Sequence, residues 1–260
     1  MSGSGGVQSV ERALDLLEAL AAGSGSQGIS ELAAAAGLAD GTAHRLLRTL
    51  VARGYARQGP NRRYTLGTRL LALGEPARRA LAAGAGPVLE RLVAASGETA
   101  NLAVLDGDAA VYVAQAPSPH RLRLFAEVGR HVAVHSTAVG KVLLTGLAEP
   151  EVHAILDRAG LPGRTPRTIT EPDLLVREVG TSAARGYAVD DEEEETGVRC
   201  LAVPVCDGET VIAAVSISGP AARVPTSPSA ALLGALNDAA AQLSSALTAP
   251  SARERQTTAP

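Results

Sequence analysis

A basic segment near the N-terminus holds the side chains best suited to binding a polyanion. Residues 41–74 contain seven arginines and no acidic residue, whereas residues 1–40 contain one arginine and five acidic residues. The rest of the chain is net acidic, and the formal charge of the whole is -3. Because nucleic-acid binding needs a local positive surface rather than a basic protein, this division predicts two domains with different tasks.

Polar residues in the C-terminal half have a spacing that favours a ligand pocket. Ser216 and Ser218 alternate within an apolar stretch typical of a strand, so both hydroxyls can point to one side. Cys200 is a small neutral residue that a largely apolar binding site tolerates. These groups suit a ligand with a carboxylate or a hydroxyl. The alternative is that the cysteine belongs to the core and the serines are polar strand ends.

Patterns for catalysis or metal binding are weak in this chain. The six consecutive acids Asp190–Glu195 lack the spaced oxygens and turn glycine of a calcium loop, so a solvated face is expected. His131 and His135 are four residues apart but share an apparent strand or loop, which predicts no metal site. No nucleophile elbow or phosphate-binding glycine loop occurs. We therefore expect no enzyme activity, no cofactor and no metal, with an enzyme acting at the Cys200 pocket as an alternative.

The composition sets further limits on function. The 260 residues, 46% of them apolar, suffice for one large domain or two small ones. Aromatic residues make up 2%, which argues against the stacking platforms of single-strand binders. Cys200 and Cys206 would lie about 20 Å apart on an extended segment, too far for a disulfide. No long apolar run and no secretory signal is present, so a cytoplasmic protein without a membrane partner is expected.

The N-terminal pattern predicts three helices with helix-turn-helix spacing. An apolar stripe indicates a helix over Ser9–Ala22, Ser30 is the expected N-cap of a short second helix, and a third runs from about Asp40 to Arg53. Apolar residues of the third helix share one arc. The opposite arc carries Arg45, Arg48 and Thr49, with Thr42 and His44 at its margins.

A hairpin follows the third helix and resembles the wing of a winged helix. Two short extended segments flank a turn at residues 59–61, and the tip presents Arg57, Arg62 and Arg63. A helix of this size fits the major groove, where arginine can contact guanine in bidentate fashion while wing arginines neutralise phosphates. A protein whose cationic face binds an acidic partner is the alternative. The predicted DNA-binding residues are Thr42, His44, Arg45, Arg48, Thr49, Arg57, Arg62 and Arg63.

The remaining chain predicts an α+β domain behind a linker helix. Residues 75–96 are helical with a break around residues 84–87, and strands are expected at residues 99–105, 109–115, 121–127, 199–205 and 210–218. Helices are expected at residues 137–147, 149–159, 171–185 and 227–247. The expected parts are a disordered N-terminus (1–6), the winged helix (7–73), the linker (74–97), a domain with an antiparallel sheet flanked by helices (98–248) and a disordered tail (249–260).

Several long motifs, in order, resemble the IclR family of bacterial transcriptional regulators. The residues in question are Val7–Leu17, Thr42–Leu47, Gly54-Tyr55, Gly129–Lys141, Thr168–Glu171, Gly186–Glu193 and Gly197–Val205. Family members usually carry a basic residue and Ser or Thr before Thr42, where this chain has Asp40-Gly41, a potential N-cap. The resemblance implies a homodimer or tetramer, an operator-binding winged helix and a GAF-like effector domain.

The resemblance also implies a set of effector-binding residues. In relatives that bind small organic acids, the matching positions hold the ligand; here they are Asp190, Cys200, Ser216 and Ser218, with Thr137, Ala138 and Gly140 at a turn. A helix that starts near Thr137 would add backbone N–H groups. Asp190 would need protonation or a water bridge to face an acid. The resemblance thus implies a ligand-responsive regulator of operator DNA with a small, acidic organic effector.

Overall fold

The computed structural model describes residues 7–23, 25–82, 84–124 and 127–248. The chain divides into two compact units, residues 1–77 and residues 78–260, which are described separately. The segments expected to be disordered, residues 1–6 and 249–260, lie outside the described residues. Within the described part, no helix combines the length and apolar character needed to cross a bilayer.

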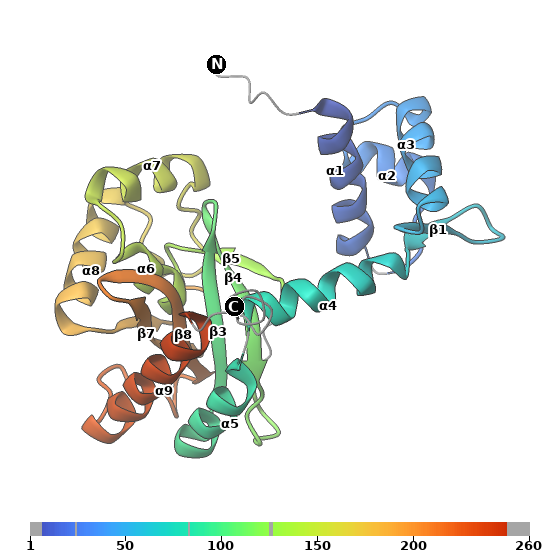
Figure 1. The fold of residues 1–260 in the computed structure, drawn as a ribbon. Helices are drawn as coiled ribbons and strands as arrows, with labels where there is room; N and C mark the ends of the chain where they lie inside the picture. Colours follow the sequence, from blue (N-terminus) through green and yellow to red (C-terminus); the bar gives the residue numbers. More distant parts are fainter. Residues whose placement is uncertain (1–6, 24, 83, 125–126, 249–260) are drawn as a thin grey trace, which may run out of the picture. The chain divides into compact units, whose positions relative to one another are not determined.

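The N-terminal unit is a helix-turn-helix followed by a small hairpin (Figure 1). Its elements are α1 (Gln8–Ala22), α2 (Ile29–Ala35), α3 (Asp40–Ala52), β1 (Ala56–Gln58) and β2 (Tyr64–Leu66). The strands pair in antiparallel fashion, and Gln27 forms a further bridge to Tyr64. The apolar arcs of the three helices enclose one core around Leu16, Leu32 and Leu47, each fully buried. The predicted winged helix is confirmed.

Two predicted helix starts are wrong in detail. The N-cap of α2 is Gly28, whose N–H donates to the Glu31 carboxylate at 2.8 Å. Ser30 lies inside the helix, and its hydroxyl donates to Asp40 Oδ2 at 2.9 Å. The N-cap of α3 is Ala39, so Asp40 is the first helical residue rather than the cap. The Glu31 carboxylate thus satisfies the N–H of the N-cap residue, whereas a serine N-cap would have accepted from an N–H further into the helix.

Two helices span the predicted linker region. Helix α4 (Arg69–Leu81) begins earlier than residue 75, and α5 (Ala85–Ser96) follows it. The break between them is at Gly84, which has a φ of +71°. A residue with a side chain rarely adopts this left-handed conformation, which explains the glycine. The predicted interruption is confirmed.

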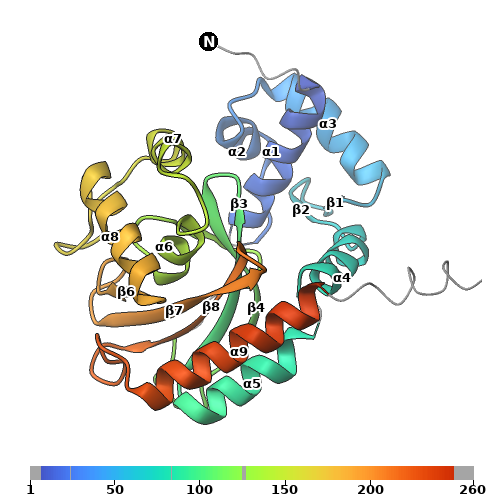
Figure 2. The same ribbon diagram turned by 60° about the vertical axis from the view of Figure 1, so that its left-hand side comes forward.

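The C-terminal unit is built on a six-stranded antiparallel sheet with the order β5-β4-β3-β8-β7-β6. The strands are β3 (Thr99–Asp106), β4 (Ala109–Ala116), β5 (His131–Ala133), β6 (Ala188–Asp191), β7 (Val198–Asp207) and β8 (Thr210–Pro220). Helices α5 and α9 (Ala230–Thr248) lie side by side on one face (Figure 2). The other face packs against α6 (Ala138–Leu144), α7 (Glu149–Ala159) and α8 (Pro172–Arg185).

The two faces of the sheet differ in the size of many of their side chains. The α5/α9 face presents large residues such as Leu102, Leu201 and Ile217. The opposite face presents alanines, including Ala103, Ala188, Ala202 and Ala214. Small side chains on this face leave room for α6, and Gly140 of α6 packs against the backbone just after β5, where an added Cβ would lie 2.3 Å from Val134 Cα. This face also carries the polar residues of the pocket described below.

One predicted strand is wrong. Residues 121–124 form no strand, and residues 125 and 126 lie outside the described part. The position beside β4 is taken by β5, in which Val132 pairs with Ala110. Because β5 occupies that edge, the alternating segment around Leu122 has no strand to pair with, and Leu122 is 71% exposed. The short strands β5 and β6 were not expected from the sequence pattern.

Candidate functional site

The outward face of α3 is polar and cationic, as the helical pattern predicts. His44, Arg45, Arg48 and Thr49 are exposed, Thr42 is half-buried, and Ala43, Leu47 and Leu50 are buried in the core. The hydroxyl of Thr49 donates to the Arg45 carbonyl at 3.2 Å, so it is partly engaged by its own helix. The two arginines are one turn apart and extend from the same side of a helix of 13 residues.

The wing arginines differ in their surroundings. Arg57 and Arg62 are exposed, and Arg62 has a φ of +58° at the turn. Arg63 instead donates from Nε and Nη2 to the Ser26 carbonyl, at 2.9 and 2.7 Å, and from Nη2 to Glu31 at 2.8 Å. The Gly28 N–H, and then Arg63, hold the pKa of Glu31 below its usual value. Arg63 therefore links the wing to the residues at the start of α2 through these hydrogen bonds and this ion pair.

A cavity of about 380 Å³ lies on the α6–α8 side of the sheet. Strand register aligns four of its lining residues, because Thr99 pairs with Ser218, Ser218 with Cys200, and Cys200 with Asp190. They form a row across β3, β8, β7 and β6. Three of the residues that the family resemblance implied thus lie side by side, and Thr137 lines the same cavity.

The other three implied residues lie behind the cavity wall rather than on it. Ser216 is fully buried and accepts from Asn101 Nδ2 at 3.5 Å, and the same amide donates to Ser218 Oγ at 3.3 Å. Ala138 and Gly140 are buried in α6 and do not line the cavity. Thr137 caps α6 itself by accepting from the Gly140 N–H at 3.2 Å. Ser216, Ala138 and Gly140 therefore support the cavity wall from behind, whereas Thr137 lines the cavity.

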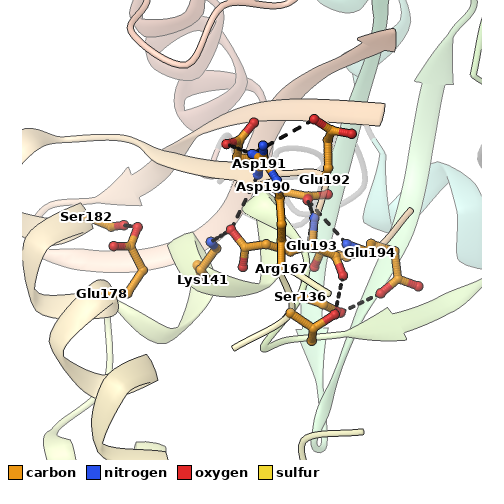
Figure 3. Close-up of polar contacts among 12 residues, drawn as sticks. Ser136, Lys141, Arg167, Glu178, Ser182, Asp190, Asp191, Glu192, Glu193 and Glu194 are labelled. Carbon is orange, nitrogen blue, oxygen red and sulfur yellow. Dashed lines mark hydrogen bonds and ion pairs between the residues drawn. The ribbon is translucent and has the colours of Figure 1, made fainter. Parts of the chain in front are cut away.

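Most of the acidic segment, Asp190–Glu195, is engaged in polar contacts within the C-terminal unit (Figure 3), and of its six residues only Glu195 is exposed. Asp190 is 1% exposed, and its Oδ1 accepts from the N–H groups of Glu193 and Glu194 at 2.8 and 3.3 Å. Glu193 Oε1 pairs with Lys141 Nζ at 2.7 Å, and Ser136 donates to Glu194. The expectation of a solvated face is wrong for all but Glu195, because Lys141 of α6 supplies a buried cation and Ser136, just before α6, supplies a hydroxyl.

Burial dominates the protonation of these groups. It raises the pKa of Asp190 to about 7, although the two backbone N–H groups and Lys141 oppose the change. Burial also raises the pKa of Glu193 despite its ion pair with Lys141. The pKa values of the Cys200 thiol and the Tyr112 phenol are raised as well, mainly by burial, so both stay neutral. No histidine is among the described residues that line the cavity, and the titratable group beside the thiol is the buried Asp190 carboxyl.

Sequence reasoning missed several residues of the cavity. Beyond the row described above, the wall includes Asn101, Tyr112, Arg130, Arg164 and Glu194. Arg130 directly precedes β5, and Arg164 lies between α7 and α8. Their contribution depends on the path of loops that have no periodic pattern. The only available signal was the position of Arg130 inside the motif at residues 129–141.

Comparison with known proteins agrees with both parts of this description. The model of the IclR helix-turn-helix domain matches residues 9–60, and that of the bacterial transcriptional regulator IclR C-terminal domain matches residues 77–245. The HTH-type transcriptional regulator BhcR of Paracoccus denitrificans is 37% identical over 246 residues, which are 93% of this chain and 88% of that protein. The transcriptional repressor IclR of Escherichia coli is 38% identical over 226 residues, 85% and 82% of the two chains.

A solved structure of a family member covers both units of this chain. The crystal structure of an IclR homolog from Microbacterium hydrocarbonoxydans, complexed with 4-hydroxybenzoate, has a TM-score of 0.78 and 25% identity, and covers 93% of this chain and 100% of its own. The relatives are named as regulators and repressors rather than enzymes. This chain, with its DNA-binding helix-turn-helix and its ligand-binding C-terminal domain, belongs to the IclR family of bacterial transcriptional regulators.

Proposed function

We propose that the protein is a cytoplasmic homodimer that reads an operator with α3 and the wing and releases or engages it when a small organic acid binds the cavity. The observation that carries the proposal is the exposed cationic face of α3, which lies within a segment of seven arginines and no acid. We assign base contacts to Arg45 and Arg48, with Thr42, His44 and Thr49 at the edge of the contact. Arg57 and Arg62 neutralise phosphates, and Arg63 positions the wing.

The cavity supports the ligand half of the proposal. Its row of Thr99, Ser218, Cys200 and Asp190, with Thr137 on the same wall, suits a small oxygenated molecule, and the homolog solved with 4-hydroxybenzoate holds an organic acid. The effector controls DNA affinity to the extent that it binds one arrangement of the paired chains better than another, typically by about 1–3 kcal/mol. Ser216, Ala138 and Gly140 support this site from behind its wall.

Selection of bound fragments from sheared genomic DNA of the source organism tests the DNA assignment. Wild-type protein should enrich a few fragments at near-physiological salt. The Arg45→Ala/Arg48→Ala variant should lose about 30-fold or more in affinity for them, because each bidentate arginine contact contributes about 1–3 kcal/mol of discrimination. The matched control is Arg121→Ala/Arg177→Ala, which removes two exposed arginines from the C-terminal unit.

The outcomes separate the alternatives. Enrichment by wild type and the control, but not by the α3 variant, supports sequence-specific regulation. Binding that competes equally with any polyanion would favour a protein with an acidic protein partner instead. An α3 variant that selects the same fragments with unchanged affinity would contradict the assignment of α3.

A further inference from the structure

The cavity carries opposite charges on its two sides, and the strand order shows why. Arg130 lies on the β5 side, where its carbonyl accepts from the Tyr112 N–H at 3.3 Å. Val132, two residues further along, lines the same cavity, so both side chains point to one face. Asp190 lies at the opposite end of the sheet, on β6. The lining therefore runs from a guanidinium to a buried carboxyl group.

A second guanidinium is on the same side as Arg130. Arg164 lines this cavity and also a neighbouring hollow formed by residues 131–135 and Pro162, so it lies close to β5. Within the described part of the chain, neither Arg130 nor Arg164 forms an ion pair. The contrast is with Arg158, Arg167, Arg185, Arg199 and Arg223, all of which pair with carboxylates. Both side chains are exposed, so two guanidiniums without an ion pair lie where an anion could reach them from solvent.

The other side of the cavity accepts hydrogen bonds. Asp190, Glu194 and Glu195 line it together with the neutral groups Cys200 and Ser218. The backbone N–H groups on Asp190 reach only its Oδ1. A ligand group there meets more acceptors than donors, and a second carboxylate at this end would be repelled by Glu194.

We propose that the effector is a small carboxylic acid that carries a hydrogen-bond donor at its far end, that is, a hydroxy acid or an amino acid. The carboxylate binds Arg130 and Arg164, and the hydroxyl or ammonium group donates to the side formed by Asp190 and Glu194. The inference rests on the proposed role of the cavity as the effector site. Arg130, which lies within the motif at residues 129–141, and Arg164 are then specificity-determining residues in addition to the positions that the family resemblance implied.

Calorimetric titration of the full-length protein with matched aliphatic compounds tests this ligand class. The set comprises ω-hydroxy acids and ω-amino acids from three to six carbons, with the plain acid, the diol and the dicarboxylate of each length. At the length that fits, the hydroxy or amino acid should bind about tenfold or more tighter than the other three, because each of those leaves one end unpaired or repelled. Equal or tighter binding of a plain acid or dicarboxylate, or no binding by any hydroxy or amino acid, overturns the proposal.

Variants identify which residues bind each end of the ligand. Arg130→Gln/Arg164→Gln should abolish the preference for the hydroxy acid over the diol, whereas Arg177→Gln, an exposed position on α8, should retain it. Asp190→Asn should weaken an amino acid more than a hydroxy acid, because the amide still accepts from a hydroxyl but lacks charge for an ammonium. An Arg130/Arg164 variant with unchanged preference contradicts the orientation.

The same preparations distinguish this inference from the proposed function. DNA fragment selection needs only α3 and the wing, whereas the titrations need only the cavity. If wild-type protein selects DNA fragments but shows no preference for hydroxy or amino acids, only the proposed ligand class is overturned. Intact ligand preference with no fragment selection overturns the regulator and leaves the cavity assignment standing.

Discussion

Asp190 shows how position in the sheet changes the chemistry of a residue. In the sequence it starts a run of six acids, and such a run normally remains ionised in water. In the structure it is the last residue of the row that begins at Thr99 and crosses four strands, and it is almost fully buried. The pKa of about 7 that results makes it a group that both donates and accepts near neutral pH. This dual character suits a site whose ligand brings its own donor.

The raised pKa of Asp190 predicts a particular pH dependence of stability. Between about pH 4 and pH 7 the folded protein retains a proton that the unfolded chain has released, so the free energy of unfolding falls as pH rises and levels off above about pH 7. A shift of this size corresponds to at most about 4 kcal/mol. Denaturant unfolding of wild type and Asp190→Asn at about pH 5 and pH 8 measures the difference.

The asparagine variant serves as the reference because it cannot titrate. Glu193, Glu194, Lys141, Cys200 and Tyr112 surround Asp190 and remain in both proteins, so their contributions largely cancel. Wild type should lose more stability than the variant between the two pH values. Parallel pH profiles would contradict a buried, protonated Asp190.

At the scale of elements, α6 and the acidic segment form one unit. Lys141 lies in the middle of α6, and Glu193 reaches it from the segment after β6. Both side chains are buried, at 1% and 10% exposure, and Glu193 Oε2 has no hydrogen-bond partner among the described residues. A buried ion pair of this kind contributes little net stability but is costly to break from one side.

Removal of one partner should therefore destabilise more than removal of both. Lys141→Met leaves Glu193 buried without its cation and should lower the free energy of unfolding by about 3–5 kcal/mol. The double variant Lys141→Met/Glu193→Leu should recover much of that loss, because no charge is left in the interior. Equal stability of the single and double variants in denaturant unfolding would show that the pair does not act as a unit.

The sequence predicts elements with a regular pattern far better than it predicts the cavity. The period of α3 correctly places Arg45 and Arg48 on the outside, because a helical wheel needs only local information. The row from Thr99 to Asp190 needs the register of four strands, one of which, β6, has only four residues. Arg130 and Arg164 reach the cavity from loops, and Lys141 meets Glu193 across 52 positions, so no local pattern indicates either contact.

At the scale of the whole molecule, α1 and α4 leave apolar surface uncovered within the single chain. Val10 and Leu14 of α1 are 54% and 51% exposed, and Leu71 of α4 is 74% exposed. Val10 and Leu14 are four residues apart and share one side of their helix. Such a stripe on a DNA-binding unit is what a homodimer would bury, and a dimer presents two recognition helices to two half-sites.

A pair of charges on the α1 stripe tests the proposed dimer. Wild type should sediment at about twice the 26.3 kDa mass of the chain. Val10→Glu/Leu14→Glu should bind a two-half-site operator about tenfold or more weaker, because two buried like charges oppose the pairing of the DNA-binding units. Leu174→Glu, at an exposed position on α8, is the control. Unchanged operator affinity of the α1 variant would remove this stripe from the interface.

Lys141 is the only lysine of the chain, and its ammonium is enclosed between α6 and the acidic segment. Every exposed cationic side chain is therefore an arginine, apart from any protonated histidine, so acylation of lysine cannot tune the charge of the native surface. Because Lys141 is enclosed, the reactivity of its amine can be used to detect local opening of the effector domain. An amine-reactive label can attach to this side chain only when the contact with Glu193 opens, so the rate of its modification follows the opening of the effector domain itself.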